Sequence, residues 1–181
     1  MFPTMKLRAT ALLCLVAGLF AAGPVLSAKP TEEKASRVRV EFTDPEKFTD
    51  FRDSVFVTDK GREALVEQFR DCLNDLARRY VPEKQMLEIR FTDIDLAGEY
   101  EPWRGPNFDD VRIVKDLYSP RLQFEFRVLD AASGAVVKSG KENIRDMGFL
   151  MNAARLPSHD AIRYEKEMLT DWMRREFKPS K

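Results

Sequence analysis

A short alternating pattern occurs twice in the sequence, with a helical segment between the two copies. Apolar and charged residues alternate in both Val38–Asp44 and Leu87–Asp93, and both segments end in Phe-Thr-Asp. A period of two is typical of a strand with one buried face. The intervening residues have the apolar spacing of an amphipathic helix that is capped by Thr58 or Asp59 and ended by Pro82. If this helix is a crossover connection, the two strands are parallel neighbours and their Phe-Thr-Asp ends lie at the same edge of one sheet.

Two more strands are predicted further along the chain. Leu122–Val128 has the same strand pattern, and a turn at Ser133-Gly134 returns Ala135–Ile144 as its antiparallel partner. The segment Val111–Tyr118 is a candidate for a further strand.

A second amphipathic helix is predicted near the C-terminus, beginning at Ser158 or Asp160, with Asp171 and Arg175 paired one turn apart. Its apolar stripe consists of Tyr164, Met168, Leu169, Trp172 and Met173. The sequence therefore predicts an α+β fold. It has a mixed four- to five-stranded sheet, with β-α-β followed by antiparallel strands, and two main helices.

The N-terminus has the composition of a secretion signal. Lys6 and Arg8 precede an uninterrupted run of apolar or small residues at 11–22, and the small residues Ser27 and Ala28 follow. We predict cleavage after Ser27 or Ala28. The apolar run is shorter than the roughly 20 residues of a spanning helix, so no transmembrane anchor is expected after cleavage.

Cleavage divides the chain into a signal peptide at 1–28, a flexible lead-in at 29–36 and a single α+β domain at 37–178. The whole chain has 30 basic and 30 acidic residues, so loss of Lys6 and Arg8 leaves the mature chain with a formal charge of −2. These charges are interspersed along the chain and form no basic patch for a phosphate backbone. Nucleic acid is not an expected partner.

The two Phe-Thr-Asp ends suggest a carboxylate site. Asp44, Asp93 and Asp95 would gather at one edge of the sheet, and Asp93 and Asp95 would share the face of the apolar strand residues if the strand continues. With Glu99 or Glu101 they would suit a divalent cation or acid/base chemistry. The alternative is that these side chains end the strands in water.

The segment Gly98–Phe108 combines aromatic residues with turn-forming residues. Long loops with their own aromatic residues often carry function. Tyr100 and Trp103 would form a stacking platform for a sugar or peptide, with Arg104 binding a carboxylate or phosphate. In the alternative, Trp103 folds back over the sheet and Arg104 pairs with Asp109 or Asp110. The candidate binding residues are Asp93, Asp95, Glu99, Tyr100, Trp103 and Arg104.

Few residues suit covalent catalysis. Cys14 leaves with the signal, so Cys72 has no disulfide partner, and its place on a helical apolar stripe predicts a buried, inert thiol. His159 is the only histidine, which makes a Ser-His-Asp triad or a two-histidine metal site hard to build. The composition therefore favours a protein that is not an enzyme.

Three segments carry a resemblance to a known family. These are Phe91–Pro106, Asp110–Asp116 and Tyr164–Lys166. From about Val38 to Phe177 the chain resembles a family of secreted bacterial proteins catalogued as domain of unknown function 3016. The resemblance implies export in a Gram-negative bacterium and hence a periplasmic location. It implies no activity, ligand or catalytic residue.

These observations lead to two hypotheses. The first is a non-catalytic binding or accessory module of the periplasm that contacts an envelope protein or a glycan through the Gly98–Phe108 loop. The alternative is a carboxylate-based metal-dependent enzyme or metal binder that uses Asp44, Asp93 and Asp95, with a divalent cation as its cofactor. The sequence leaves the oligomeric state open.

Overall fold

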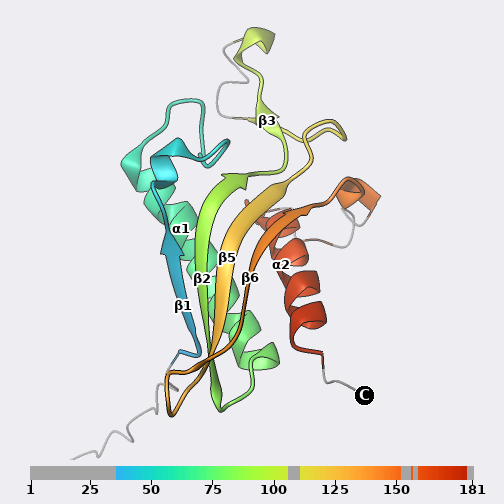
Figure 1. Ribbon diagram of the computed structural model, residues 1–181. Coiled ribbons are helices and arrows are strands. Elements are labelled where there is room, and N and C mark those ends of the chain that lie inside the picture. The colour runs from blue at the N-terminus through green and yellow to red at the C-terminus, as the bar shows by residue number, and fades with distance from the viewer. Residues whose placement is uncertain (1–35, 106–110, 152–155, 157–158, 179–181) are drawn as a thin grey trace, which may run out of the picture. The chain divides into compact units, whose positions relative to one another are not determined.

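The computed structural model describes residues 36–105, 111–151, 156 and 159–178 (Figure 1). The predicted signal peptide, and the lead-in up to residue 35, lie outside these ranges. The elements in chain order are β1 (Val38–Phe42), η1 (Pro45–Lys47), α1 (Asp59–Tyr80), β2 (Gln85–Asp95), β3 (Glu99–Tyr100), η2 (Pro102–Arg104), β4 (Arg112–Ile113), β5 (Arg121–Asp130), β6 (Val136–Arg145) and α2 (Arg163–Glu176).

The repeated strand pattern forms a parallel pair. β1 and β2 lie side by side, and their register aligns the two copies residue for residue, from Val38 opposite Leu87 to Phe42 opposite Phe91. The pairing continues one residue further, because the Thr43 N–H donates to the Phe91 carbonyl at 3.0 Å. This confirms α1 as a crossover connection between parallel neighbours.

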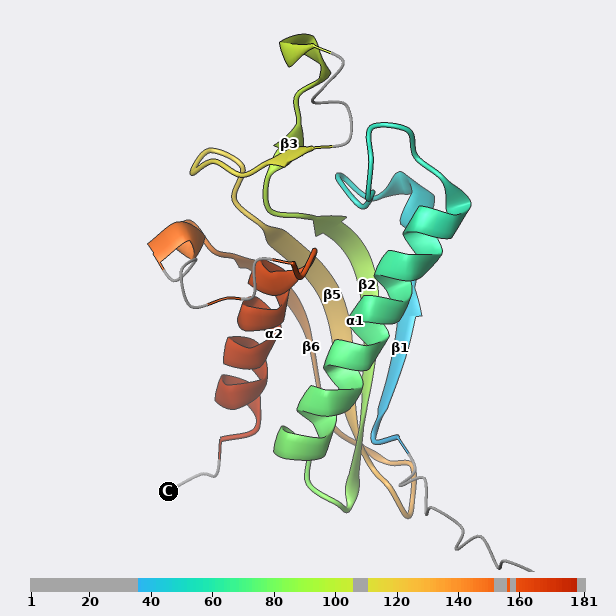
Figure 2. The same ribbon diagram turned by 180° about the vertical axis from the view of Figure 1, so that it is seen from behind.

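The main sheet has four strands in the order β1-β2-β5-β6, with β5 antiparallel to both of its neighbours. Both helices cover the same face of this sheet (Figure 2). The opposite face, called here the open face, carries the charged members of the alternating patterns of β1, β2 and β5. The α+β class and mixed sheet are as predicted. The candidate strand at Val111–Tyr118 is reduced to the two residues of β4, which pair with β3 in a separate two-stranded sheet.

A β-bulge interrupts β2 at Thr92. The register with β5 shifts between Phe91 and Asp93, so Thr92 has no residue opposite it. Leu87, Ile89 and Phe91 are buried before the bulge, whereas Ile94 is buried after it. The prediction that Asp93 and Asp95 share a face with the apolar residues was therefore wrong, because the extra residue moves both carboxylates to the open face.

Aromatic rings form a continuous chain of contacts through the core, between the sheet and the two helices. Phe91 lies at its centre, within 5.2–5.5 Å of three other rings, those of Phe42, Phe69 and Phe124. Trp172 of α2 meets Phe124 edge-on at 4.9 Å. Such geometries add to the stabilisation from burial alone.

The helix ends follow local capping chemistry. The Thr58 side chain accepts a hydrogen bond from the Gly61 N–H at 3.0 Å, which confirms Thr58 as the cap of α1. α2 begins at Arg163, later than predicted, because the Asp160 carboxylate accepts the Ile162 N–H in the turn before the helix. The predicted partner of Asp171 was also wrong, since the pair forms at i,i+3 with Arg174. Within the described ranges, neither α1 nor α2 has the length and apolar content of a membrane-spanning helix.

Replacement of Phe91 tests the central place of its ring. Phe91→Ala is expected to lower the free energy of unfolding by about 3–5 kcal/mol, because a fully buried ring leaves a cavity. Urea denaturation provides the measurement. Phe56→Ala is the matched control, since the Phe56 side chain is 71% exposed and its loss should cost little. Similar losses in the two variants would contradict the assignment.

Candidate functional site

A small arm extends the chain beyond the end of β2. We use the term arm for residues 97–105 and 111–118, in which β3 and β4 pair through Glu99–Ile113 and Tyr100–Arg112 (Figure 1). Gly98 at the base of the arm has a φ of 83°, and a Cβ there would lie 2.9 Å from the Ile113 carbonyl oxygen. Glycine is therefore required where the two sides of the arm approach each other.

The Arg112 guanidinium joins the arm to the main fold. It donates to both oxygens of the Asp50 carboxylate, at 2.7 and 3.2 Å, and Asp50 is only 4% exposed. It also donates to the carbonyls of Gly98 at 3.0 Å and Arg52 at 2.9 Å. Asp50 is itself held by backbone hydrogen bonds with Ile94 and Leu96 at the end of β2. A bidentate pair with further acceptors has the geometry that a buried ion pair needs.

Tyr100 is enclosed by this network. Its ring lies under the Arg112 guanidinium, 4.6 Å from its centroid, and Arg52 lies 5.5 Å away. Arg52 also donates to Glu99 at 2.6 Å. Tyr100 and Glu99 were both predicted to bind a ligand, but their side chains contact Arg52 and Arg112 within the protein. The guanidinium groups cover the Tyr100 ring.

Glu101 anchors the tip of the arm. The carboxylate is 1% exposed and accepts hydrogen bonds from Lys115, from the Tyr118 hydroxyl at 2.8 Å and from Arg104. Lys115 and the other donors hold the pKa of Glu101 at about 2, well below its usual range. The Arg104 guanidinium, predicted to bind an external anion, is thus engaged by Glu101; the predicted alternative partners Asp109 and Asp110 lie outside the described residues.

Trp103 projects from this braced tip. Its side chain is 73% exposed, although it lies between the anchored Glu101 and Arg104. The alternative in which Trp103 folds back over the sheet does not agree with this exposure. The Trp103 ring is thus exposed to solvent, while its neighbours Glu101 and Arg104 are held in place by their ion pairs.

Other exposed apolar side chains lie at the same end of the fold. Leu117 is at the base of the arm, and the segment after β6 contributes three more; Figure 1 shows both segments beyond the end of the sheet. The Ser119 hydroxyl contacts the Met147 sulfur at 3.4 Å and so links the two segments. We define the apolar end as Trp103, Leu117, Met147, Leu150 and Met151, all of them exposed.

A second, smaller core supports the apolar end. Ala97, Phe149 and Tyr164 are buried together, apart from the main core, and the Phe149 and Tyr164 rings meet edge-on at 4.9 Å. Glu165 of α2 lies beside it and is fully buried. Its Oε1 accepts the Ala97 N–H at 2.7 Å, while its Oε2 has no hydrogen-bond partner among the described residues. Burial raises the pKa of Glu165 to about 7.

The three predicted metal ligands do not form a metal site with one another in the described part of the chain. Asp44 pairs with Lys47 at 2.8 Å, and Asp93 pairs with Arg121 at 2.7 Å and also accepts from Thr49. Asp95 is half-buried, and this burial raises its pKa. Within the described ranges there is no group of three or more histidine, cysteine or acidic side chains arranged to hold a metal ion. The geometry does not favour the metal hypothesis.

The two residues considered for covalent catalysis lie apart from the arm. Cys72 is partly buried on α1, and burial raises the pKa of its thiol to about 12, so the thiol stays protonated at neutral pH. His159 is exposed in the turn before α2 rather than within the helix. Neither residue has a role in the arm.

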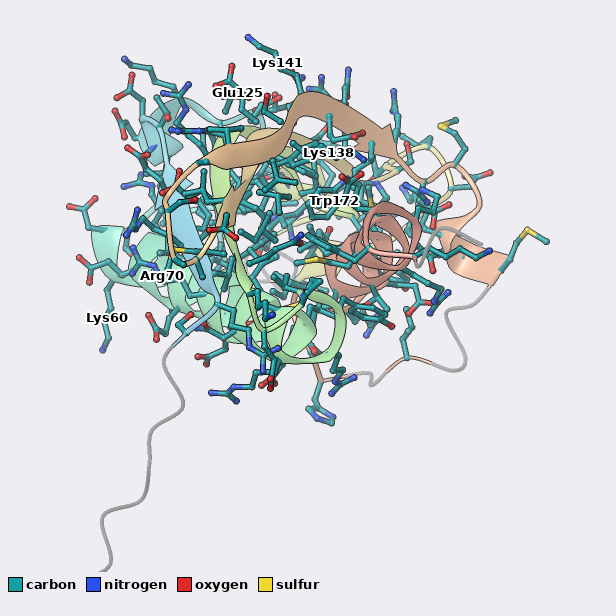
Figure 3. All side chains as sticks on the ribbon, turned by 60° about the horizontal axis from the view of Figure 1, so that its bottom comes forward. Lys60, Arg70, Glu125, Lys138, Lys141 and Trp172 are labelled. Atoms are coloured by element: carbon teal, nitrogen blue, oxygen red, sulfur yellow. The ribbon has the colours of Figure 1, made fainter. Side chains whose placement is uncertain are left out.

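A depression of about 650 Å³ lies on the open face, between the charged residues of all four strands. Glu125 pairs with Arg90 and Lys141, and Glu88 pairs with Arg39 and Arg127, so each carboxylate is placed between two cations. Figure 3 shows Glu125 and Lys141 on this side of the sheet. The charges largely neutralise one another, which is typical of a solvated sheet face.

Sequence reasoning missed most of the residues that build the arm. Asp50 and Arg112 are 62 positions apart, and no spacing rule relates them. Lys115 and Tyr118 fell within a candidate strand, and Glu165 within a helix with many exposed charges. The one available signal was the density of aromatic and turn-forming residues around Trp103.

The fold and its anchored arm define a class of small α+β domains with a one-sided four-stranded sheet. The chain belongs to the family described as "Protein of unknown function (DUF3016)", whose model matches residues 36–175. This confirms the family resemblance seen in the sequence.

Other comparisons add little. The search of curated proteins found no match. Among solved structures, one from Caulobacter crescentus described as "a putative lipoprotein" is 21% identical, with 80% of this chain and 95% of that chain covered, at a TM-score of 0.26. A likeness of this size carries no argument about this chain.

The Arg112–Asp50 pair should be the main support of the arm. Arg112→Met leaves Asp50 buried without its bidentate partner and is expected to lower the free energy of unfolding by about 3–5 kcal/mol. Arg112→Lys should recover little of this stability, because an ammonium group cannot form the bidentate contact with the Asp50 carboxylate. Arg39→Met removes an ion pair from an exposed arginine and should cost no more than about 1 kcal/mol. Equal effects at Arg112 and Arg39, measured by urea unfolding, would contradict this role.

Glu165 should make stability depend on pH. Its folded-state pKa of about 7 lies above its ordinary value of 4.5, so the native state binds the proton more tightly than the unfolded chain. The contribution of Glu165 to the free energy of unfolding is therefore greatest below about pH 4.5 and is lost as the pH rises to about 7. Glu165→Gln mimics the protonated form and removes this dependence. A difference between wild type and variant that stays constant from pH 4.5 to 7.5 would contradict the prediction.

Proposed function

We propose that this protein is a non-catalytic binding module of the bacterial cell envelope, and that the tip of its arm is the contact surface. The observation that carries the proposal is Trp103, which is 73% exposed and is flanked by residues in fixed positions. Exposed aromatic side chains on a rigid base are typical of binding hot spots, because little conformational entropy is lost on binding.

The surroundings of Trp103 support a protein or glycan partner. An indole ring stacks on the apolar face of a sugar or packs against a peptide. Arg104 and Lys115 are both engaged by Glu101, so the tip presents little free positive charge. An apolar and aromatic contact is therefore better supported than recognition of an anion.

The periplasmic location is part of the proposal. It is supported by the basic residues and apolar run that precede Ala28. Fractionation of cells that express the full chain tests it, since a periplasmic protein is released with the periplasmic fraction in a form shortened by about the length of the signal.

The partner itself can be sought with Trp103 as the probe. The chain has two tryptophans, and Trp172 is buried, so acrylamide quenching reports mainly on Trp103. We expect soluble peptidoglycan fragments or a captured envelope protein to protect Trp103 from quenching. Trp103→Ala should weaken binding at least about tenfold, as for a hot-spot residue, and Trp103→Phe should weaken it less.

The control is Phe56→Ala, which removes an exposed aromatic ring outside the arm and should leave binding unchanged. Circular dichroism checks that each variant is folded. Retention of the same partner at unchanged affinity by Trp103→Ala would show that the arm tip is not the contact surface.

A further inference from the structure

The outer edge of β6 is free of strand partners. β6 has 10 residues and pairs only with β5, so it ends the sheet within the described part of the chain. Val136 and Val137 at its start are both exposed. An edge of this length presents a row of backbone groups that can pair with another strand.

The register identifies which groups point outward. The Asp146 N–H donates to the carbonyl of Pro120, which lies opposite it when the β5–β6 register is extended by one residue. In an antiparallel pair, such residues alternate with residues whose N–H and C=O point away. Ser139, Lys141 and Asn143 therefore direct their backbone groups to the free edge.

The sequence of β6 is complementary to itself around Gly140. If two copies pair antiparallel with Gly140 opposite Gly140, Lys138 of each copy lies opposite Glu142 of the other, and Ser139 lies opposite Lys141. Directly opposed charges of opposite sign stabilise strand pairs. A pairing centred one residue further would place Lys141 opposite itself, and one centred on Glu142 would oppose two carboxylates, so both are disfavoured.

The side chains agree with this register. Lys138 forms an ion pair with Glu176 of α2 at 2.6 Å and so lies on the helix-covered face, as Figure 3 shows. Glu142 is opposite the buried Phe124 and therefore projects to the same face. The two charges that would meet across the interface are thus on one side of the joined sheet.

Gly140 suits the centre of such an interface. It is opposite Phe126, whose ring would lie 2.7 Å from an added Cβ, so this site has no room for a side chain. At the axis the Gly140 residues would form a non-hydrogen-bonded pair, the type in which two backbones approach to about 4.5 Å between Cα atoms. The regular pairing covers residues 138–142 of each copy, because a β-bulge at Val137 shifts the register of β6 with β5.

We propose that β6 is a dimer interface whose partner is a second copy of this chain, joined antiparallel about Gly140 into one continuous sheet. The contact is isologous, so a closed two-fold dimer forms rather than a fibre. The inference is independent of the proposed binding by the arm, since the arm and β6 are separate surfaces.

Sedimentation of the purified protein over a range of concentrations tests the proposal. Wild type is expected to show a reversible monomer–dimer equilibrium. Glu142→Lys places a lysine opposite Lys138 of the other copy on each side of the axis and should raise the dissociation constant at least about tenfold. The double variant Lys138→Glu/Glu142→Lys restores opposite charges, so its dissociation constant should be within about threefold of wild type. Glu41→Lys makes the same charge change on β1 and should have no effect.

A second variant examines the backbone. Ser139→Pro removes an N–H that points to the free edge and costs no bond to β5, so it should abolish the dimer while the monomer stays folded. Two results would overturn the proposal. One is a monomer at every concentration up to about 1 mM, a weak limit for specific association. The other is a dimer that Ser139→Pro and Glu142→Lys leave intact, which would place the interface elsewhere.

Discussion

Both helices lie on one face of the four-stranded sheet, and this constraint governs where every strand side chain can go. Apolar residues must occupy the covered face, so β1, β2 and β5 alternate and the open face is charged. The chain of aromatic rings around Phe91 fills the covered side. The bulge at Thr92 keeps this arrangement while the strand continues, because it moves Ile94 into the core that Asp93 would otherwise enter. The end of β2 is thereby directed toward Asp50 and the arm.

The arm replaces apolar packing with buried charge. Arg112 and Asp50 satisfy each other, and nearby carbonyls take the remaining donors, so the desolvation cost of the pair is offset by good geometry. Glu101 serves the same purpose at the tip with three donors of its own. Two separate anchors hold both ends of a segment that has only two short strands. This arrangement explains how a few residues can keep Trp103 in a defined position.

The sequence was most informative where contacts follow a periodic rule. The two alternating segments and the helix between them predicted a parallel pair, because a crossover helix joins strands that run in the same direction. The bulge was missed although the sequence carries a signal for it, because the apolar residues change from odd to even positions between Phe91 and Ile94. The Arg112–Asp50 pair was missed for a different reason: it depends on where distant segments meet. Glu165 resembled an exposed helical charge, although the second core encloses it.

The separation of the two cores has a consequence for the dynamics of the molecule. Ala97, Phe149 and Tyr164 bury little apolar surface compared with the aromatic chain of the sheet, so the region around them belongs to the low-stability end of the fold. We expect this region to open while the four-stranded sheet stays intact, because its opening breaks few buried apolar contacts. Amide hydrogens of the arm would then exchange with solvent through a local event, whereas those of the central strands would exchange only on global unfolding. The two cores thus give one compact domain regions of unequal stability.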